Sequence, residues 1–167
     1  LTKNPSFIHT LKLNVPTLEG YLYPSTYFFG PGMREEDLLR KMVETFQAAA
    51  KEHLEGVEKN DDLTFQEHVI MASLIEREAR LDEDRPLIAS VVFNRLAKKM
   101  PLQIDATVHF ALNDWSRRLT LDDLKVDSPY NTYKIKGLPP GPICSPRMAS
   151  LVATFSPPKT DYLYYVL

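Results

Sequence analysis

Apolar and polar positions alternate along much of the chain with the three- and four-residue spacing that places side chains on one face of an α-helix. This pattern predicts a helix with a charged outer face from Glu35 to about Leu54, and another from Asp84 to about Leu96. Pro86 lies near the start of the second segment, where proline is tolerated because its missing N–H would be unpaired anyway. Met148 to Phe155 predicts a short closing helix.

The segment from Thr64 to about Arg80 is the best marked of the predicted helices. It opens with a capping box, in which the Thr64 hydroxyl and the Glu67 carboxylate each satisfy a free backbone N–H. Asp105 marks a further helix start, because its carboxylate would cap a helix running from Ala106 to Leu112.

Other segments have the composition of strands and loops. Tyr21–Tyr23 and Thr26–Phe29 are aromatic and β-prone, and Tyr162–Val166 is expected to form a terminal strand. Ser128–Pro146 is rich in proline and has no helical period, which predicts an ordered loop with extended pieces. The expected fold class is therefore α+β: a helix-rich single domain with short antiparallel strands and a long proline-rich ordered loop.

Composition narrows the classes of protein. With 167 residues, 44% of them hydrophobic, residues 1–167 can bury one sizeable core and are expected to form one domain. The 20 Lys and Arg against 22 Asp and Glu leave a net charge of -2 without a dense basic stripe, so nucleic acid is not an expected partner. The single cysteine, Cys144, excludes an internal disulfide. No signal peptide or membrane span is visible, but because the chain starts at Leu1 without methionine, we expect an excised part of a longer protein, so the missing anchor is uninformative.

Two carboxylates at the end of an apolar helix are the main candidates for chemistry. Glu76 and Glu78 point roughly 200° apart on a helix, so they cannot serve one small site equally. Glu76 precedes Arg80 by four residues, which predicts an exposed ion pair and leaves Glu76 only as an accessory candidate. Glu78 continues an apolar ridge, and its neighbour four residues on is Asp82, a like charge.

Apolar surroundings and a nearby carboxylate both raise the pKa of a carboxyl group, which keeps a proton available near neutral pH. Glu78 is therefore the candidate general acid. The spacing alone also allows a simpler interpretation, in which Glu78 ends the helix and faces water, as most glutamates at helix ends do.

The remaining polar concentrations are typical of sugar recognition. Gln103–Thr107 and Tyr130–Tyr133 place amide, hydroxyl and aromatic groups beside proline-stiffened turns, and such groups bind sugar hydroxyl and acetamido groups. Hairpin and capping roles would explain these residues almost as well. The four histidines have no ligand spacing, and no glycine-rich phosphate-binding loop is present, so neither a metal nor a cofactor is expected.

Several motifs, in one order over nearly the whole chain, resemble the endolytic murein transglycosylase family, which older classifications describe as aminodeoxychorismate-lyase-like. In chain order the motifs are Glu19-Gly20-Tyr21-Leu22-Tyr23-Pro24, 71–78 (MASLIERE), 90–96 (SVVFNRL), 102–108 (LQIDATV), 130–133 (YNTY), 137–143 (GLPPGPI) and 162–166 (YLYYV). The resemblance implies cleavage of the β-1,4 bond between N-acetylmuramic acid and N-acetylglucosamine in peptidoglycan. It assigns the catalytic acid to the second glutamate of the Glu-x-Glu pair, which is Glu78.

The resemblance also implies supporting residues, partners and a location. Gln103, Asp105, Asn131 and Tyr133 would position the sugars, and Ser73 would line the site. The substrate would be peptidoglycan glycan strands on the outer face of the bacterial cell membrane, and cell-wall synthases would be partners. The family's N-terminal membrane helix and glycan-binding module, and its C-terminal Gly/His-containing segment, are expected to lie outside this chain.

Two alternatives belong to other classes of protein. A non-catalytic glycan-binding or scaffold module of the cell-wall synthesis machinery would keep the loops but would not need a protonated Glu78. The lyase of the older family label would require a pyridoxal phosphate lysine and a phosphate-binding loop, and no such loop is evident, so it ranks last.

Overall fold

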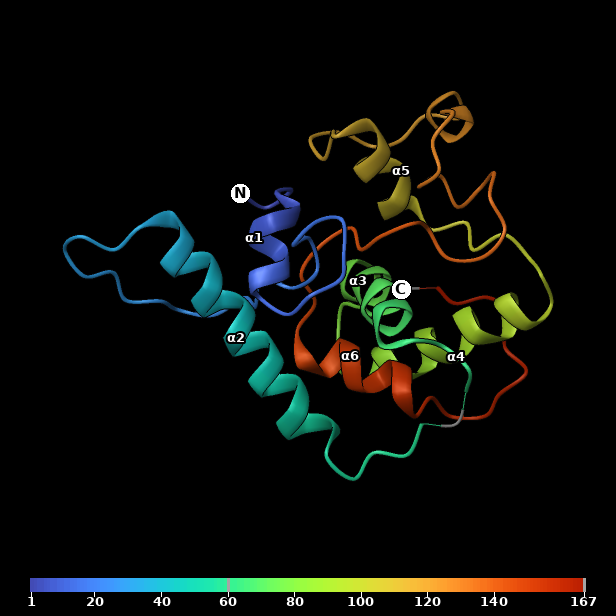
Figure 1. Cartoon of the computed structure of the whole chain (residues 1–167). Coiled ribbons are helices and arrows are strands. Elements are labelled where there is room, and N and C mark those ends of the chain that lie inside the picture. Colours follow the sequence, from blue (N-terminus) through green and yellow to red (C-terminus); the bar gives the residue numbers. More distant parts are fainter. Residues whose placement is uncertain (60, 167) are drawn as a thin grey trace.

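The computed structural model describes residues 1–59 and 61–166. This part of the chain is helical and contains no β-strand (Figure 1). The helices are α1 (Pro5–Thr10), α2 (Glu35–Leu54), α3 (Phe65–Glu78), α4 (Asp84–Ala97), α5 (Asp105–Leu112), the short 3-10 helix η1 (Asp123–Lys125) and α6 (Met148–Phe155).

The helices predicted from periodicity are confirmed as α2, α3, α4, α5 and α6, while α1 and η1 were not predicted. The capping box of α3 forms as expected: the Thr64 hydroxyl accepts from the Glu67 backbone N–H at 3.2 Å, and the Glu67 carboxylate accepts from the Thr64 N–H at 2.7 Å. The expected cap of α5 is wrong. Ile104 is the N-cap, and Asp105 is the first helical residue, which leaves its carboxylate free to contact another segment.

The predicted α+β fold class is wrong, because none of the expected strands forms among the described residues. Tyr21 instead inserts its ring into the core, 5.4 Å from the ring centroid of Phe46. The Tyr27 hydroxyl donates to the Tyr23 carbonyl at 2.8 Å, a contact within one segment. The aromatic residues here are held by individual packing contacts, so their strand-like composition does not produce a sheet.

The terminal segment is held in an extended path by side chains of α4. The Asn94 amide donates to the carbonyls of Thr160 and Tyr162 at 3.0 and 2.8 Å, and the Arg95 Nε donates to the Leu163 carbonyl at 2.7 Å. These donors satisfy backbone groups that a neighbouring strand would satisfy in a sheet. The segment therefore remains extended without becoming a β-strand.

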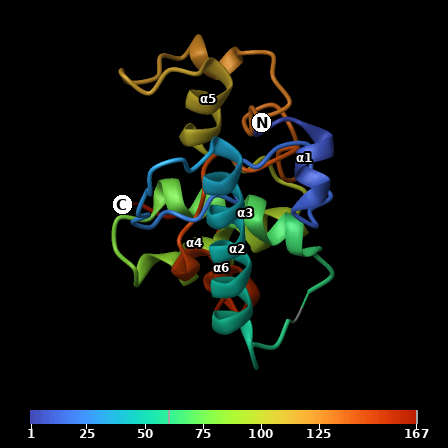
Figure 2. The same cartoon turned by 60° about the vertical axis from the view of Figure 1, so that its left-hand side comes forward.

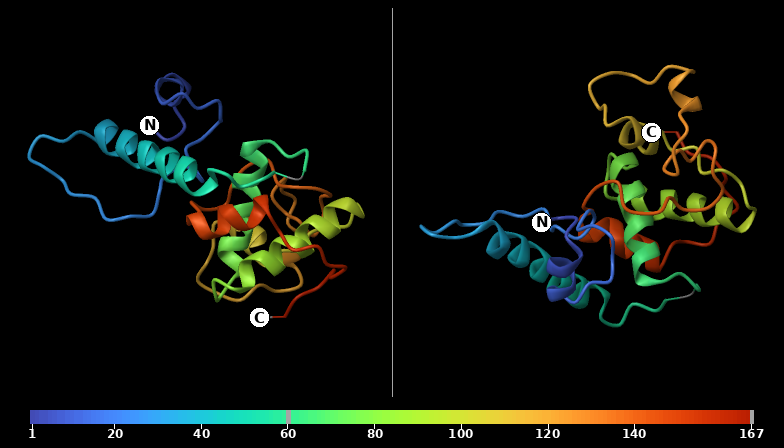
Figure 3. Two further views of the ribbon diagram at one scale, coloured as in Figure 1. Left: turned by 90° about the horizontal axis from the view of Figure 1, so that it is seen from below. Right: turned by 45° about the horizontal axis from the view of Figure 1, so that its top comes forward.

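Helix α3 lies at the centre of the fold, in contact with α4, α5 and α6, and α2 packs on α6 (Figure 2). Every residue of α3 from His68 to Ile75 is buried, as expected for a helix that is covered on all sides. Helices α1 and α2 lie to one side of the α3–α4–α6 group (Figure 3). No helix within residues 1–59 and 61–166 has both the length and the apolar character needed to cross a membrane.

The proline-rich segment 128–146 is an ordered loop, as predicted, and part of it lies in the core. Asn131 and Thr132 are fully buried, and Ile143 belongs to the apolar cluster around α3 and α4. The N-terminal segment crosses this loop at Gly20, which has a φ of +87°. A Cβ atom at Gly20 would lie 2.5 Å from Pro142, so only glycine allows this close approach.

Candidate active site

Glu78 is the last residue of α3 and lies half-buried beside the terminal segment. The Tyr165 hydroxyl donates a hydrogen bond of 3.0 Å to Glu78 Oε2. Burial and the neighbouring Glu78 carboxylate raise the pKa of Tyr165, so the phenol stays protonated and remains a donor at neutral pH.

Several groups influence the proton on Glu78. Burial is the largest influence and raises the pKa of Glu78 above its ordinary value, and the negative charge of Asp105 raises it further. The hydrogen bond from Tyr165 and the positive charge of Arg77 act in the opposite direction, but the net shift is upward. The expected direction is therefore confirmed, whereas the like charge comes from Asp105 and not from Asp82.

Asp105 and Tyr133 form the second part of the site. Asp105 begins α5, and its Oδ1 accepts a short hydrogen bond from the Tyr133 hydroxyl. Burial, together with this bond, raises the pKa of Tyr133 and keeps the phenol protonated. Thr132 holds the adjoining turn against α5, because its buried hydroxyl accepts from the Ile104 N–H at 2.9 Å. The structure thus brings Glu78, Asp105 and Tyr133 together.

Gln103 is exposed at the edge of this group and has a left-handed backbone with a φ of +53°. Its N–H donates to the Thr132 carbonyl at 3.0 Å, which ties it to the turn that carries Tyr133. Arg95 approaches the Gln103 side-chain oxygen at 3.4 Å and donates to the Leu102 carbonyl at 2.8 Å. Gln103 is therefore held by backbone contacts near the site, with its side chain accessible.

Two other sequence-predicted residues are buried in supporting positions. The Asn131 side-chain amide donates to the carbonyls of Leu124 and Val126 at 3.0 and 2.8 Å. The Ser73 hydroxyl donates to the Ile70 carbonyl at 2.6 Å and accepts from the Ile143 N–H at 3.0 Å. The Ser73 contact attaches the proline-rich loop to α3, and the Asn131 contacts attach the same loop to the segment around η1.

Glu76 does not form the expected exposed ion pair with Arg80 among the described residues. Its side chain is only 16% exposed and accepts from the Ser150 hydroxyl at 2.6 Å and from Arg147 Nε at 2.8 Å. Nη2 of the buried Arg85 lies 3.6 Å from Glu76 Oε1, the oxygen that also accepts from Arg147. Burial alone would raise the pKa of Glu76, but the hydrogen bonds from Ser150 and Arg147 outweigh it and lower the pKa. Glu76 thus joins α3, α4 and α6 as an ionised group.

Tyr165 and Arg95 are the site residues that sequence reasoning did not identify. Tyr165 contacts the Glu78 carboxylate directly, and Arg95 holds the terminal segment by its bond to the Leu163 carbonyl. The family-like YLYYV motif at 162–166 was the available signal for Tyr165, but it was interpreted as a strand. Strand periodicity could not reveal a contact between residues that are 87 positions apart.

This arrangement is suited to proton transfer to a polar substrate. The surroundings of Glu78 raise its pKa and so favour its protonated form, and Tyr165 orients the carboxyl group through one oxygen. Asp105, Tyr133 and Gln103 add acceptors and donors at the exposed side. No three His, Cys, Asp or Glu side chains in the described residues are grouped so that they could hold a metal ion.

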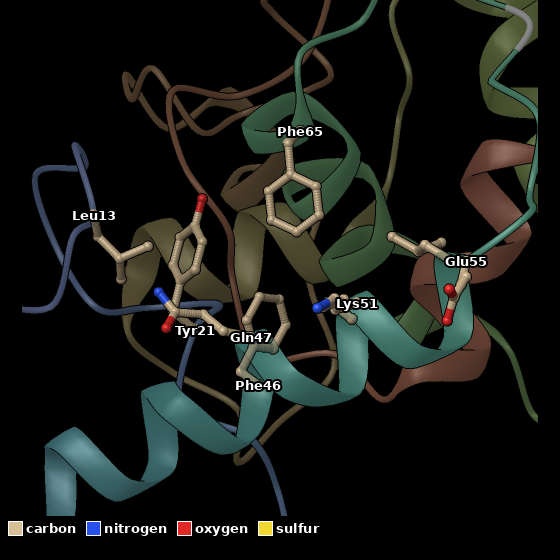
Figure 4. A pocket seen from close by; sticks show the side chains of 9 residues that line it. Leu13, Tyr21, Phe46, Gln47, Lys51, Glu55 and Phe65 are labelled. Carbon is tan, nitrogen blue, oxygen red and sulfur yellow. The ribbon is translucent and has the colours of Figure 1, made fainter.

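A separate hollow of about 370 Å³ lies between α2 and the N-terminal segment, away from these residues. Figure 4 shows that Tyr21, Phe46 and Phe65 form its apolar wall, with Lys51 on α2 and Glu55 directly after the end of α2. None of the predicted site residues lines it.

Comparisons with known proteins place the motifs in a family. The sequence profile of the YceG-like family matches residues 2–167. A protein of Bacillus subtilis (strain 168) named endolytic murein transglycosylase is 46% identical over 150 residues, which cover 89% of this chain and 41% of that protein. A protein of the same name from Streptococcus pneumoniae serotype 2 is 36% identical over 157 residues, covering 89% of this chain and 28% of that protein.

The fold has a solved counterpart. The crystal structure of a yceG-like protein from Listeria monocytogenes superposes with a TM-score of 0.86 at 38% sequence identity, covering 99% of this chain and 59% of that one. The chain thus spans less than half of the two curated relatives and about three fifths of the solved chain.

Proposed function

Because the chain belongs to the YceG-like family, we propose that residues 1–167 form the catalytic domain of an endolytic peptidoglycan lytic transglycosylase. The substrate is the glycan strand of peptidoglycan, and the bond cleaved is the β-1,4 bond between N-acetylmuramic acid and N-acetylglucosamine. The names of the B. subtilis and S. pneumoniae relatives support this assignment. The observation that carries it is the half-buried Glu78, whose pKa is raised and whose carboxyl group is hydrogen-bonded by Tyr165.

The reaction uses one carboxyl group twice. Protonated Glu78 gives its proton to the glycosidic oxygen while the bond from that oxygen to C1 of muramic acid breaks. The resulting Glu78 carboxylate then removes the proton of the muramic 6-hydroxyl, whose oxygen forms a new bond to C1. The products are a 1,6-anhydromuramic end and a new N-acetylglucosamine end, and Glu78 regains its proton.

The surrounding residues support each half of this cycle. Burial and the Asp105 charge favour the protonated form of Glu78 that starts the reaction. The Tyr165 hydrogen bond stabilises the carboxylate formed in between. Sugar hydroxyl and acetamido groups bind to Asp105, Tyr133 and Gln103. The contacts of Asn131 and Ser73 hold the proline-rich loop in position.

The proposal extends to the setting of the reaction. Cleavage occurs on the outer face of the cell membrane, where it limits the length of nascent glycan strands. Anchoring by a part of the protein outside these 167 residues and contact with cell-wall synthases belong to the same proposal, and their support is the family resemblance.

Digestion of purified glycan strands, followed by mass analysis of the product ends, tests the function. The parent chain is expected to release strands that end in 1,6-anhydromuramic acid. Reducing muramic ends would show that water is the nucleophile and that a second carboxyl group takes part, as in hydrolases. Absence of cleavage by the parent and by a longer version of the protein would overturn the proposal.

A further inference from the structure

Arg77, the residue before Glu78 in α3, belongs to a stack of three side chains. The guanidinium of Arg77 sits over the Trp115 ring, 4.0 Å from its centroid. The His109 ring lies nearly parallel to the same indole, at 5.3 Å between centroids and 18° between planes. His109 is itself fixed, because its Nδ1 lies 2.6 Å from the Asp114 carbonyl.

Arg77 differs from Arg85, Arg95 and Arg147, three other arginines around α3 and α4. Arg85 and Arg147 are paired with carboxylates, and Arg95 donates to backbone carbonyls. Arg77 is exposed and makes no hydrogen bond or ion pair to the described residues. Stacking on Trp115 restricts the guanidinium but occupies only its flat face, so the N–H edge is free to bind a carboxylate through two bonds.

The stack and the proposed acid share one surface. Arg77 precedes Glu78 in α3, and the charge of Arg77 acts on the Glu78 carboxyl group. On α5, His109 follows Asp105 by four residues, one helical turn along the same face. Glu78 is therefore subject both to the negative charge of Asp105 and to the positive charge of Arg77.

We propose that Arg77, held on Trp115, selects muramic acid for the cleavage position by binding a carboxylate on its 3-O-lactyl substituent. This inference rests on the proposed function. Glucosamine has no such substituent, so a stacked Arg77 distinguishes the two alternating sugars: the anionic one is attracted to Arg77, while the like charge of Asp105 disfavours its binding next to Asp105. The carboxylate is that of the lactyl group itself on strands without peptides, and that of the stem peptide on strands that carry them.

Binding measurements on the inactive Glu78→Gln chain test the inference with three ligands: strands bearing stem peptides, strands stripped of peptides by an amidase, and chitin oligosaccharides. Adding Arg77→Gln is expected to weaken binding of muramic strands roughly tenfold, the loss expected for one charge-assisted contact, and to leave chitin binding unchanged. The loss should shrink at high salt. Because the chain has 1 Trp, the intrinsic fluorescence of Trp115 reports whether the ligand reaches the stack.

Arg118→Gln is the matched control, since Arg118 is exposed and its side chain makes no ion pair with the described residues. A loss with stripped strands identifies the lactyl carboxylate, and a loss only with peptide-bearing strands identifies the stem peptide. Equal losses with chitin and muramic strands, or no loss with either, would overturn the role of Arg77. If the parent cuts strands but Arg77→Gln binds them normally, only this inference fails; if the parent neither binds nor cuts strands, the proposed function fails as well.

Discussion

Replacing Tyr165 with phenylalanine isolates the contact that opposes protonation of Glu78. The change removes one hydroxyl and its 3.0 Å hydrogen bond to Glu78 Oε2 while keeping the ring that packs in the core. Without this donor the Glu78 carboxylate is less stable, so the pKa of Glu78 should rise above its already raised value.

The size of the rise follows from the strength of the lost bond. A hydrogen bond to an ionised group contributes about 1.5–3 kcal/mol. The protonated carboxyl group keeps part of this interaction in the parent, so the difference between the two forms is smaller, about 1–1.5 kcal/mol. Since one pKa unit corresponds to about 1.4 kcal/mol, the pKa of Glu78 should rise by about one unit.

The assay is the pH dependence of kcat/KM for cleavage of purified glycan strands. Activity requires protonated Glu78, so it declines on the alkaline side as pH passes the pKa of Glu78. In Tyr165→Phe this decline should move to higher pH by about one unit. Tyr164→Phe is the matched control, because Tyr164 is 71% exposed and its ring, which contacts Arg95, is retained. An unmoved or acid-shifted decline in Tyr165→Phe would refute the role assigned to this bond.

Further predictions concern the two glutamates and metal dependence. Glu78→Gln should abolish cleavage and keep the fold. Because the pKa of Glu78 is higher in the folded chain than in the unfolded chain, its ionisation lowers the stability of the fold as pH rises from the unfolded pKa to the folded pKa. Glutamine cannot ionise, so the variant should have a higher Tm than the parent at neutral pH. A lower Tm would contradict this sign. Glu76→Gln should cost about 2 kcal/mol and lower Tm by about 4–8 °C, since it weakens the bonds from Ser150 and Arg147, and an unchanged denaturation midpoint would contradict it. Chelator treatment should leave cleavage unchanged, because proton transfer by Glu78 suffices; loss of activity restored by zinc would refute this.

The contacts of Glu76 show where sequence reasoning stopped. Its neighbour at four residues, Arg80, was the only cation that helical spacing could assign to it. Its actual partners, Arg147 and Ser150, lie 71 and 74 positions away and arrive because α6 packs on α3. The predicted exposed ion pair of Glu76 with Arg80 therefore named the wrong partner, and the contacts with Arg147 and Ser150 lead us to expect a substantial loss of stability when Glu76 is replaced.

The strands failed for a related reason. Aromatic composition at Tyr21–Tyr23 and Tyr162–Val166 favours strands, but it does not determine what each segment packs against. In the first segment Tyr21 packs against a helix, and in the second the carbonyls accept from Asn94 and Arg95. Either outcome satisfies side chains and backbone as well as a sheet would.

The sequence by itself determined the features that depend on neighbours along the chain. The starts of α2, α3 and α4, the capping box at Thr64 and the position of Glu78 at the end of a buried helix all follow from contacts within one or two helical turns. Tertiary structure alone decided that Tyr165 bonds to Glu78 from 87 positions away, that Asp105 supplies the like charge, and that Arg77 rests on Trp115. Such contacts depend on how the helices and loops pack together, because packing brings distant residues within bonding distance and excludes the water that would otherwise solvate their charges.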